Sequence, residues 1–170
     1  MSAISVSTPI TSVRSLSKSR RTSLLAGLFF AATFITSIAA RLLYEPVLNH
    51  TDFILGSGDV TRVTIGAALE LLLIIANIGT ALVLYPVLRR QSEVAALGWV
   101  AARIMESAFI AVGILALLAI VTLRQESGAE PATLVAIGES LVAIHDWTFW
   151  VGPGFVVGIG NGLLLGYLMF

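Results

Sequence analysis

The sequence predicts an all-α protein, a polytopic transmembrane helical bundle with four spans and an outer amphipathic helix. Of its 170 residues, 57% are hydrophobic and 12% are charged, which is more apolar surface than a soluble domain of this length can bury. Several apolar runs reach the roughly 20 residues that cross the hydrocarbon core of a bilayer. The net charge is zero and cysteine is absent, so disulfides and Cys-ligated metals are excluded and no nucleic-acid partner is expected.

The chain begins with a basic tail rich in Ser and Thr, at residues 1–22, which precedes a transmembrane domain at 23–170. The first apolar run predicts a span at about 23–43. A transit peptide or a secretory signal is the alternative. The run is longer than a usual signal core and further apolar segments follow it, which favours an uncleaved anchor. After a polar loop, Asp59 is a natural N-cap for the helix that contains the second span, at about 63–88.

Two further spans are expected in the second half of the chain. A short polar turn implies that the third span, at about 97–123, runs antiparallel to the second. Pro131 then opens a pattern typical of an amphipathic helix on the outer membrane surface or against the bundle. Its apolar side consists of Leu134, Ile137, Leu141 and Ile144. Trp147 and Trp150 are placed as an aromatic belt would be, at the start of the fourth span at about 150–170.

Basic residues set the expected orientation of these spans. Four precede the first span and two lie between the second and the third, whereas the opposite side has only Arg41, Arg62 and Arg124. Because basic residues are enriched in cytoplasmic loops, the N-terminus is predicted to face the cytoplasm.

Charged residues within the spans are the first candidates for function. Arg103 and Glu106 are three residues apart, so they share a helix face, and pairing offsets part of the cost of about 2.5–3.5 kcal/mol per charge. Glu70 is expected at a different depth, with Arg41 as its partner. One interpretation is that both pairs are structural. The other is that Glu70 or Glu106 takes up a proton or binds a cationic solute during transport.

Small and amide side chains predict close helix packing. The fourth span contains a glycine at every fourth position, beside Asn161, and Asn77 lies on a small, polar face of the second span. The four glycines are Gly154, Gly158, Gly162 and Gly166. We expect this ladder to pack within the chain rather than to drive self-association.

Two histidines on the outer side are the candidate metal ligands. His50 and His145 each lie near an acidic residue, and imidazole with carboxylate suits a divalent metal, so His50, His145 and Asp146 form the candidate set. The sequence has no HExxH or GxSxG motif, so catalysis would depend on Glu70, Glu106 or the histidines alone. We therefore expect no catalytic residues and no cofactor.

Three stretches resemble a bacterial family of multi-pass membrane proteins catalogued as domain of unknown function 4386. They are ALVLYPVLRR at 81–90, the element from Arg103 to Glu106 followed by Ser-Ala, and HDWTFWVGPGFVVGIGNGLLLGYLM at 145–169. The resemblance covers roughly residues 22–170. It implies a bacterial inner membrane and supplies no activity, substrate or catalytic residue. It also implies about two further spans after a basic, Pro-containing loop, so the chain is expected to be truncated or shortened at its C-terminus.

The expected role is therefore that of a multi-pass integral membrane protein that is not an enzyme: structural, accessory or small-ligand-binding. A small transporter or proton-linked carrier using buried carboxylates is the alternative, and an enzyme with an outer-face metal site is the second. The expected partners are the lipid bilayer and either a second copy of the chain or another membrane protein. A solvent-connected cavity at Glu70 or Glu106 would favour transport, and a dry, fully paired interior would favour a scaffold.

Overall fold

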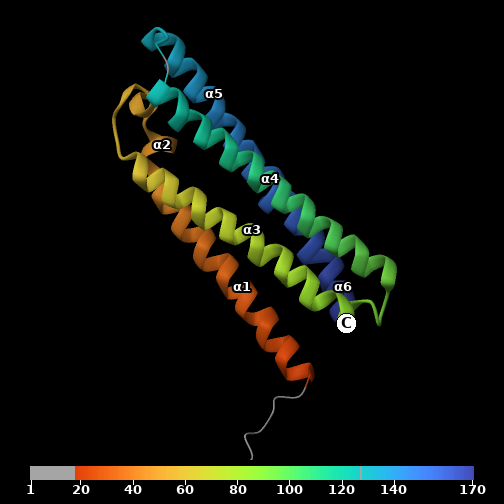
Figure 1. The fold of residues 1–170 in the computed structure, drawn as a ribbon. Coiled ribbons are helices and arrows are strands. Elements are labelled where there is room, and N and C mark those ends of the chain that lie inside the picture. The colour runs from red at the N-terminus through yellow and green to blue at the C-terminus, as the bar shows by residue number, and fades with distance from the viewer. Residues whose placement is uncertain (1–17, 127) are drawn as a thin grey trace, which may run out of the picture.

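The computed structural model describes residues 18–126 and 128–170. Within these ranges every regular element is a helix, and there is no strand. Four rods account for most of it (Figure 1). The first three are α1 (Lys18–Leu43), α3 (Val60–Leu88) and α4 (Glu93–Glu126), and α1 and α3 are joined through α2 (Glu45–Asn49) and a short 3₁₀ helix, η1 (Thr51–Leu55). The fourth rod is one continuous helix made of α5 (Pro131–Phe149), two π-helical stretches, η2 (Trp150–Val156) and η3 (Gly158–Leu164), and α6 (Leu165–Met169).

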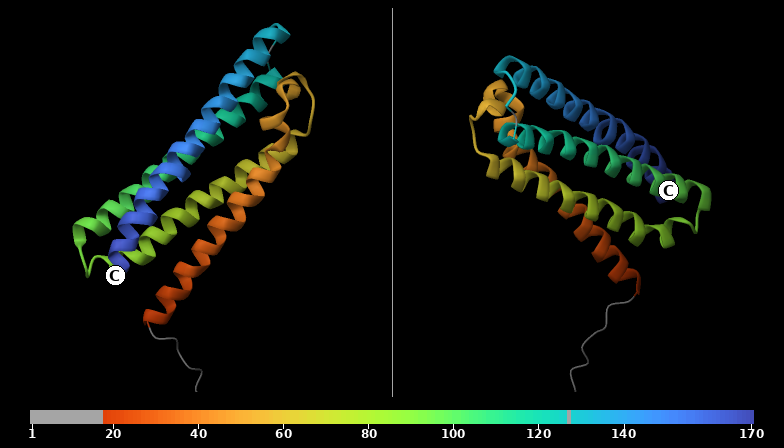
Figure 2. Two further views of the ribbon diagram at one scale, coloured as in Figure 1. Left: turned by 180° about the vertical axis from the view of Figure 1, so that it is seen from behind. Right: turned by 45° about the horizontal axis from the view of Figure 1, so that its top comes forward.

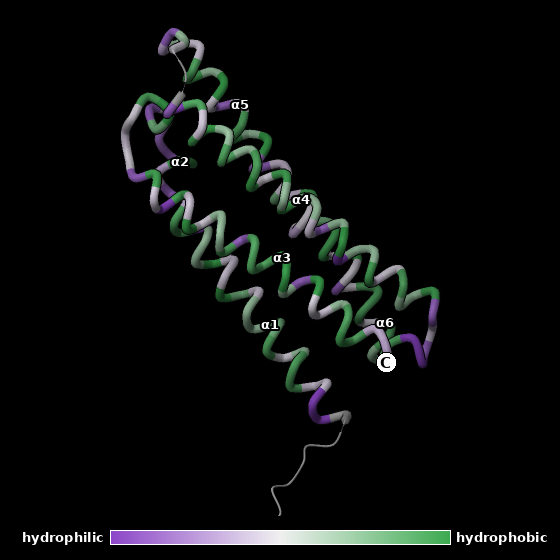
Figure 3. Tube along the Cα trace, in the orientation of Figure 1, coloured by the Kyte–Doolittle hydropathy of each residue, from purple (hydrophilic) through white to green (hydrophobic). Residues whose placement is uncertain are grey.

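Each rod is long and apolar enough to cross a membrane, as predicted for the fold class. The candidate spans within the described residues are Arg20–Leu43, Val60–Leu88, Glu93–Gln125 and Pro131–Met169. Residues 1–17 of the predicted basic tail lie outside the described residues, and its last part, from Lys18, already belongs to α1. Hydrophobic residues extend along all four rods, and hydrophilic residues gather at the connecting segments (Figure 3).

The rods pack in chain order. α1 packs along α3, α3 along α4, and α4 along the fourth rod, so α1 and α5 lie at the two ends of the array (Figures 1 and 2). Local signals explain where the helices begin. The Asp59 side chain accepts a hydrogen bond from the Thr61 backbone N–H at 2.8 Å, which caps α3, and Pro131 occupies the first turn of α5.

The predicted outer amphipathic helix is present as α5, but it is not a separate element. It continues directly into η2 and packs along α4 and η1 rather than lying alone on a surface. Its buried residues are Leu134, Gly138 and His145, whereas Ile137 and Ile144 of the predicted apolar side are exposed. The rotation follows from close packing, because Ile54 of η1 lies 3.4 Å from the position that a Cβ on Gly138 would occupy.

An arginine closes the end of the bundle at which α1 is connected to α3, the end predicted to face outward, and the sequence analysis had treated it only as a basic residue. Arg124 donates hydrogen bonds to the backbone carbonyls of Phe53, Gly56, Ser57 and Gly58, and its guanidinium lies 4.7 Å from the Phe53 ring centroid. Gly56 and Gly58 both have positive φ angles, 119° and 72°, which L side chains rarely adopt. We call Arg124 with residues 53–58 the outer cap.

Candidate functional site

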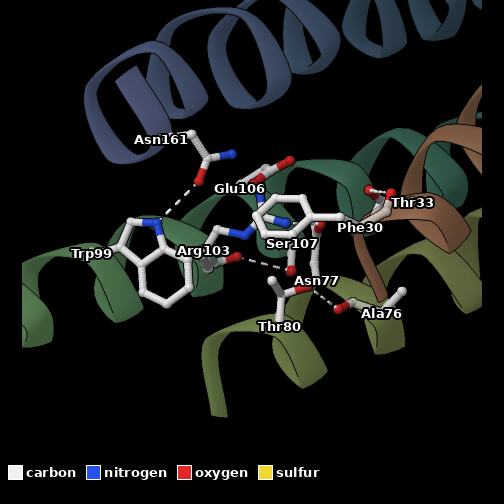
Figure 4. A network of polar contacts seen from close by, with 10 residues as sticks. All are labelled: Phe30, Thr33, Ala76, Asn77, Thr80, Trp99, Arg103, Glu106, Ser107 and Asn161. Carbon is white, nitrogen blue, oxygen red and sulfur yellow. Dashed lines mark hydrogen bonds and ion pairs between the residues drawn. The ribbon is translucent and has the colours of Figure 1, made fainter. Parts of the chain in front are cut away.

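The two charged residues that the sequence paired lie together between α3 and α4. Arg103 Nη1 donates to Glu106 Oε2 at 2.7 Å, and Arg103 Nη2 donates to Oδ1 of Asn77 on α3 (Figure 4). The Phe30 ring of α1 lies 5.8 Å from the guanidinium carbon. We call Arg103, Glu106 and Asn77 the inner polar cluster. Its pair is fixed by helical spacing within α4, and its third member joins α4 to α3.

The second predicted amide also bonds between helices. Trp99 Nε1 on α4 donates to Oδ1 of Asn161 on η3 at 3.0 Å (Figure 4). Nearby hydroxyls bond along their own helices instead: Ser107 donates to the Arg103 carbonyl, and Thr80 donates to the Ala76 carbonyl. Asn77 and Asn161 therefore attach α4 to the helices on both of its sides.

Glu70 has a partner that the sequence analysis missed. The Tyr44 hydroxyl donates to Glu70 Oε2 at 2.9 Å, while Arg41 is exposed and forms no ion pair with the described residues, so the predicted pairing of Arg41 with Glu70 is wrong. Ala40 lies on the buried face of α1, and the buried Tyr44 follows directly after the end of this helix. Arg41 follows Ala40 by about 100° around the axis, so it points away from that face. A signal was available in Gly66, one turn before Glu70. A Cβ there would lie 2.7 Å from the Tyr44 ring, so this glycine provides the space for the ring.

A cavity of about 190 Å³ connects these groups. All four rods contribute to its lining, and its polar wall includes Glu70, the inner polar cluster, His145 and Asn161. Asn77, Arg103 and His145 are only 1%, 3% and 4% exposed. The cavity therefore brings together intramembrane candidates that the sequence had placed at different depths.

The mouth of the cavity is aromatic and lies between the first and last rods. Phe34 on α1 and Phe149 on α5 both line the cavity, yet they are 68% and 47% exposed. Both belong to helices that are apolar enough to span a membrane. The cavity therefore opens sideways, toward the space that lipid chains occupy around such a bundle, and its polar wall lies inside.

The candidate metal ligands do not form a set. His145 faces the cavity, with its ring edge-on to Tyr44 at a centroid distance of 5.7 Å, and its Nδ1 lies 3.5 Å from Asp146 Oδ1. His50 is exposed, and its Nε2 lies 3.3 Å from Glu45 Oε1. Within residues 18–126 and 128–170, no three His, Asp or Glu side chains are arranged to hold a metal ion. The structure therefore does not bring His50, His145 and Asp146 together as ligands.

The glycine ladder of the fourth rod does not face the other helices. A Cβ on Gly158, Gly162 or Gly166 would meet no atom within 4 Å, and one on Gly154 would meet only atoms of its own rod, the nearest at 3.7 Å. The expectation that the ladder packs within the chain is therefore wrong for the described residues.

The packed row of the fourth rod is displaced from the ladder by two positions. A Cβ on Gly152 would lie 2.7 Å from Phe109 Cβ, and one on Gly160 would lie 2.8 Å from Ala102 Cβ. Val156 and Leu168, at the same four-residue spacing, are also buried. Two positions correspond to about half a turn of helix, so the ladder and the packed row face opposite ways.

The family model "Domain of unknown function (DUF4386)" matches residues 25–170. The chain belongs to this family. The four apolar helices support a membrane location for this DUF4386 protein. No curated protein and no solved structure matches the chain. The function of this protein must therefore be inferred from the cavity. Its polar side chains can bind and orient a ligand by hydrogen bonds, and its carboxyl and imidazole groups are able to exchange protons.

Proposed function

We propose that this DUF4386 protein is a non-enzymatic, membrane-embedded protein that binds a small ligand drawn from the bilayer. The observation that supports this is the cavity with a polar inner wall and an aromatic mouth between α1 and the fourth rod. Protein interiors pack at a density of about 0.75, so a purely structural bundle would be expected to fill such a space. Ligand pockets, in contrast, combine apolar walls with a few placed polar groups.

The proposed setting is a bacterial inner membrane with the N-terminus in the cytoplasm. Basic residues concentrate before the first span and between the second and third, which supports this orientation. The spans proposed to cross the hydrocarbon are about 23–43, 63–88, 97–123 and 150–170. In this orientation the outer cap faces away from the cytoplasm, and the cavity mouth faces lipid.

A proton-linked carrier is the second candidate, and one observation favours it. Glu70 lines the same cavity as Arg103 and Glu106, but its hydrogen-bond partner is the neutral Tyr44 and no cation pairs with it in the described part of the chain. Carboxylates inside spans are typical of proton pathways. Under this alternative, vesicles containing the protein would acidify internally in response to a ligand gradient, and Glu70→Gln would abolish the response.

A photolabelling experiment tests ligand binding directly. The protein is reconstituted in vesicles with hexadecanol bearing a diazirine, and the labelled residues are mapped by mass spectrometry. Binding predicts labelling around Phe34, Phe149 and Val157 that plain hexadecanol competes away. Val157→Phe, inside the cavity, should reduce this labelling, and Leu163→Phe, on an exposed side chain of the same rod, should not. Labelling that is uniform over the lipid-facing residues and cannot be competed would overturn the proposal.

A further inference from the structure

Three side chains that line the cavity each hold a buried nitrogen without a hydrogen bond. Within the described part of the chain, Nε of Arg103 and Nδ2 of Asn77 have no hydrogen-bond partner, and neither does Nδ1 of His145. All three side chains are more than nine-tenths buried and belong to three different rods. A buried donor left unpaired costs about 1–3 kcal/mol. The wall formed by Arg103 and Asn77 therefore offers N–H groups to a ligand that carries acceptors.

The wall formed by Arg103 and Asn77 disfavours a charged head group. The positive charge of Arg103 is already compensated by Glu106 at 2.7 Å, so an anionic head would meet no uncompensated cation at this wall. It would also face the carboxyl groups of Glu106 and Glu70, which line the same cavity. A cationic ammonium head has only donors, which cannot pair with the N–H groups of Arg103 and Asn77. The best match is an uncharged head that carries hydrogen-bond acceptors.

The size and walls of the cavity favour a flat ring. Its volume of about 190 Å³ slightly exceeds the roughly 150 Å³ of a cavity known to hold benzene, which leaves room for a six-membered ring with small substituents. Phe30 lines the cavity beside the Arg103 guanidinium, and Phe34 and Phe149 stand at the mouth. Aromatic side chains pack well against a planar ring, and the mouth leaves a path for an alkyl tail into the lipid.

From these observations we propose that the cavity binds the ring of a membrane-soluble quinone, with one ring carbonyl accepting hydrogen bonds from Arg103 Nε and Asn77 Nδ2 and the alkyl tail leaving between Phe34 and Phe149. A quinone ring is uncharged, has carbonyl acceptors and no donors, and is flat. This inference rests on the proposed function, because it names the class of ligand for the same cavity.

Trp99 provides the reporter for the test. The chain has three tryptophans, and only Trp99 is buried, with its indole N–H bonded to the cavity residue Asn161. A variant with Trp147→Phe and Trp150→Phe therefore reports from one position beside the cavity. Reconstituted in vesicles, it is titrated with decylbenzoquinone, which quenches indole fluorescence. The matched probe is decylbromobenzene, a quencher with a similar ring and tail but no carbonyl group.

The proposal predicts saturable quenching by the quinone and only gradual, linear quenching by the bromobenzene. Val157→Phe should raise the half-saturating quinone concentration roughly tenfold or more, a loss of about 1.4 kcal/mol, while Leu163→Phe should leave it unchanged. Arg103→Lys keeps a cation beside Glu106 but removes the Nε–H, so a folded Arg103→Lys protein should bind the quinone more weakly. These three results together support the proposal.

Other outcomes separate this inference from the proposed function. Equal saturation by both probes would show that the carbonyl is not recognised, which overturns the quinone assignment while leaving ligand binding intact. Linear quenching by both probes, together with competable hexadecanol labelling, would overturn the quinone and keep the proposed function. Linear quenching without competable labelling would overturn both. Unchanged quinone affinity in Val157→Phe would place any binding outside the cavity and contradict the inference.

Discussion

The two arginines of α4, one inside the helix and one in its last turn, are neutralised in different ways. Arg103 lies in the inner polar cluster, where it is 3% exposed and bonds to a carboxylate and an amide. Arg124 lies in the outer cap, where it is only partly buried and bonds to four backbone carbonyls. A charge deep in an apolar region needs a counter-charge, whereas at the helix end carbonyl dipoles and the accessible surface are sufficient.

The difference also concerns what each arginine connects. Arg103 obtains its counter-charge from its own helix and needs α3 only for the amide of Asn77. Arg124 has no acidic partner in the part of the chain that the structure describes. It instead fixes the backbone of a segment that lies 66 to 71 residues earlier in the chain. Loss of Arg103 should therefore damage the whole bundle, and loss of Arg124 should mainly loosen one loop.

The largest effect is expected for Arg103→Ala. It leaves Glu106 buried without its cation, which costs about 3–5 kcal/mol, so the amount of folded protein in the membrane fraction should fall sharply. The double variant Arg103→Met with Glu106→Leu removes both charges and should restore much of the accumulation, measured by fluorescence-detected size exclusion. Normal accumulation of the single variant would contradict a pair needed for folding.

A smaller effect is expected for Arg124→Ala. Hydrogen bonds from a charged donor contribute about 1.5–3 kcal/mol, and here the freed carbonyls can turn toward water. Hydrogen exchange at residues 53–58 should accelerate while exchange in the middle of α3 and α4 stays slow. Arg124→Lys keeps the charge but lacks the planar guanidinium, so its exchange rate at residues 53–58 should lie between those of the native chain and Arg124→Ala. If exchange accelerated equally throughout the bundle, the distinction between the inner polar cluster and the outer cap would fail.

Gly152→Ala tests how closely the fourth rod supports the inner polar cluster. The added Cβ would lie 2.7 Å from Phe109 Cβ and 3.5 Å from the Glu106 carbonyl oxygen, and such overpacking typically costs about 1–3 kcal/mol. The melting temperature in detergent should fall. Gly158→Ala, whose Cβ would meet no atom within 4 Å, is the matched control and should be neutral or slightly stabilising. Equal melting temperatures for the two variants would contradict the packed row.

Tyr44→Phe should have a modest effect that depends on pH. Loss of the hydrogen bond to Glu70 costs about 0.5–1.5 kcal/mol at neutral pH. Burial, and secondly the nearby Glu70 carboxylate, raise the pKa of the Tyr44 hydroxyl above its ordinary value. A raised pKa means that folding favours the protonated form, so this stabilisation is present below about pH 10 and is lost as the pH rises further. The melting temperature above pH 10 should therefore fall less steeply in Tyr44→Phe than in the native chain.

The smallest effect is expected for Arg41→Ala. Arg41 is exposed and forms no ion pair with the described residues, so its removal should change stability by less than about 0.5 kcal/mol. The melting temperature in detergent measures this change, with Tyr44→Phe as the comparison. A loss for Arg41→Ala that exceeds the loss for Tyr44→Phe would restore Arg41 as the partner of Glu70.

The sequence by itself determined the features that depend on position along one helix. Apolar length predicted four helices that can span a membrane, Asp59 predicted the start of α3, and a spacing of three predicted that Arg103 and Glu106 would meet. These relations follow from the fixed rise and rotation of an α-helix. They do not require knowledge of any neighbouring helix.

Only the tertiary structure decided which helix face meets which neighbour. It selected Tyr44 rather than Arg41 for Glu70, joined Asn77 to Arg103, and turned the packed row of Gly152 and Gly160 inward instead of the glycine ladder. Because the four helices are apolar on nearly every side, hydrophobicity does not distinguish one helix face from another. The rotation of each rod about its axis is set by the fit of side chains across the interface, and that fit also leaves the cavity between the first and last rods.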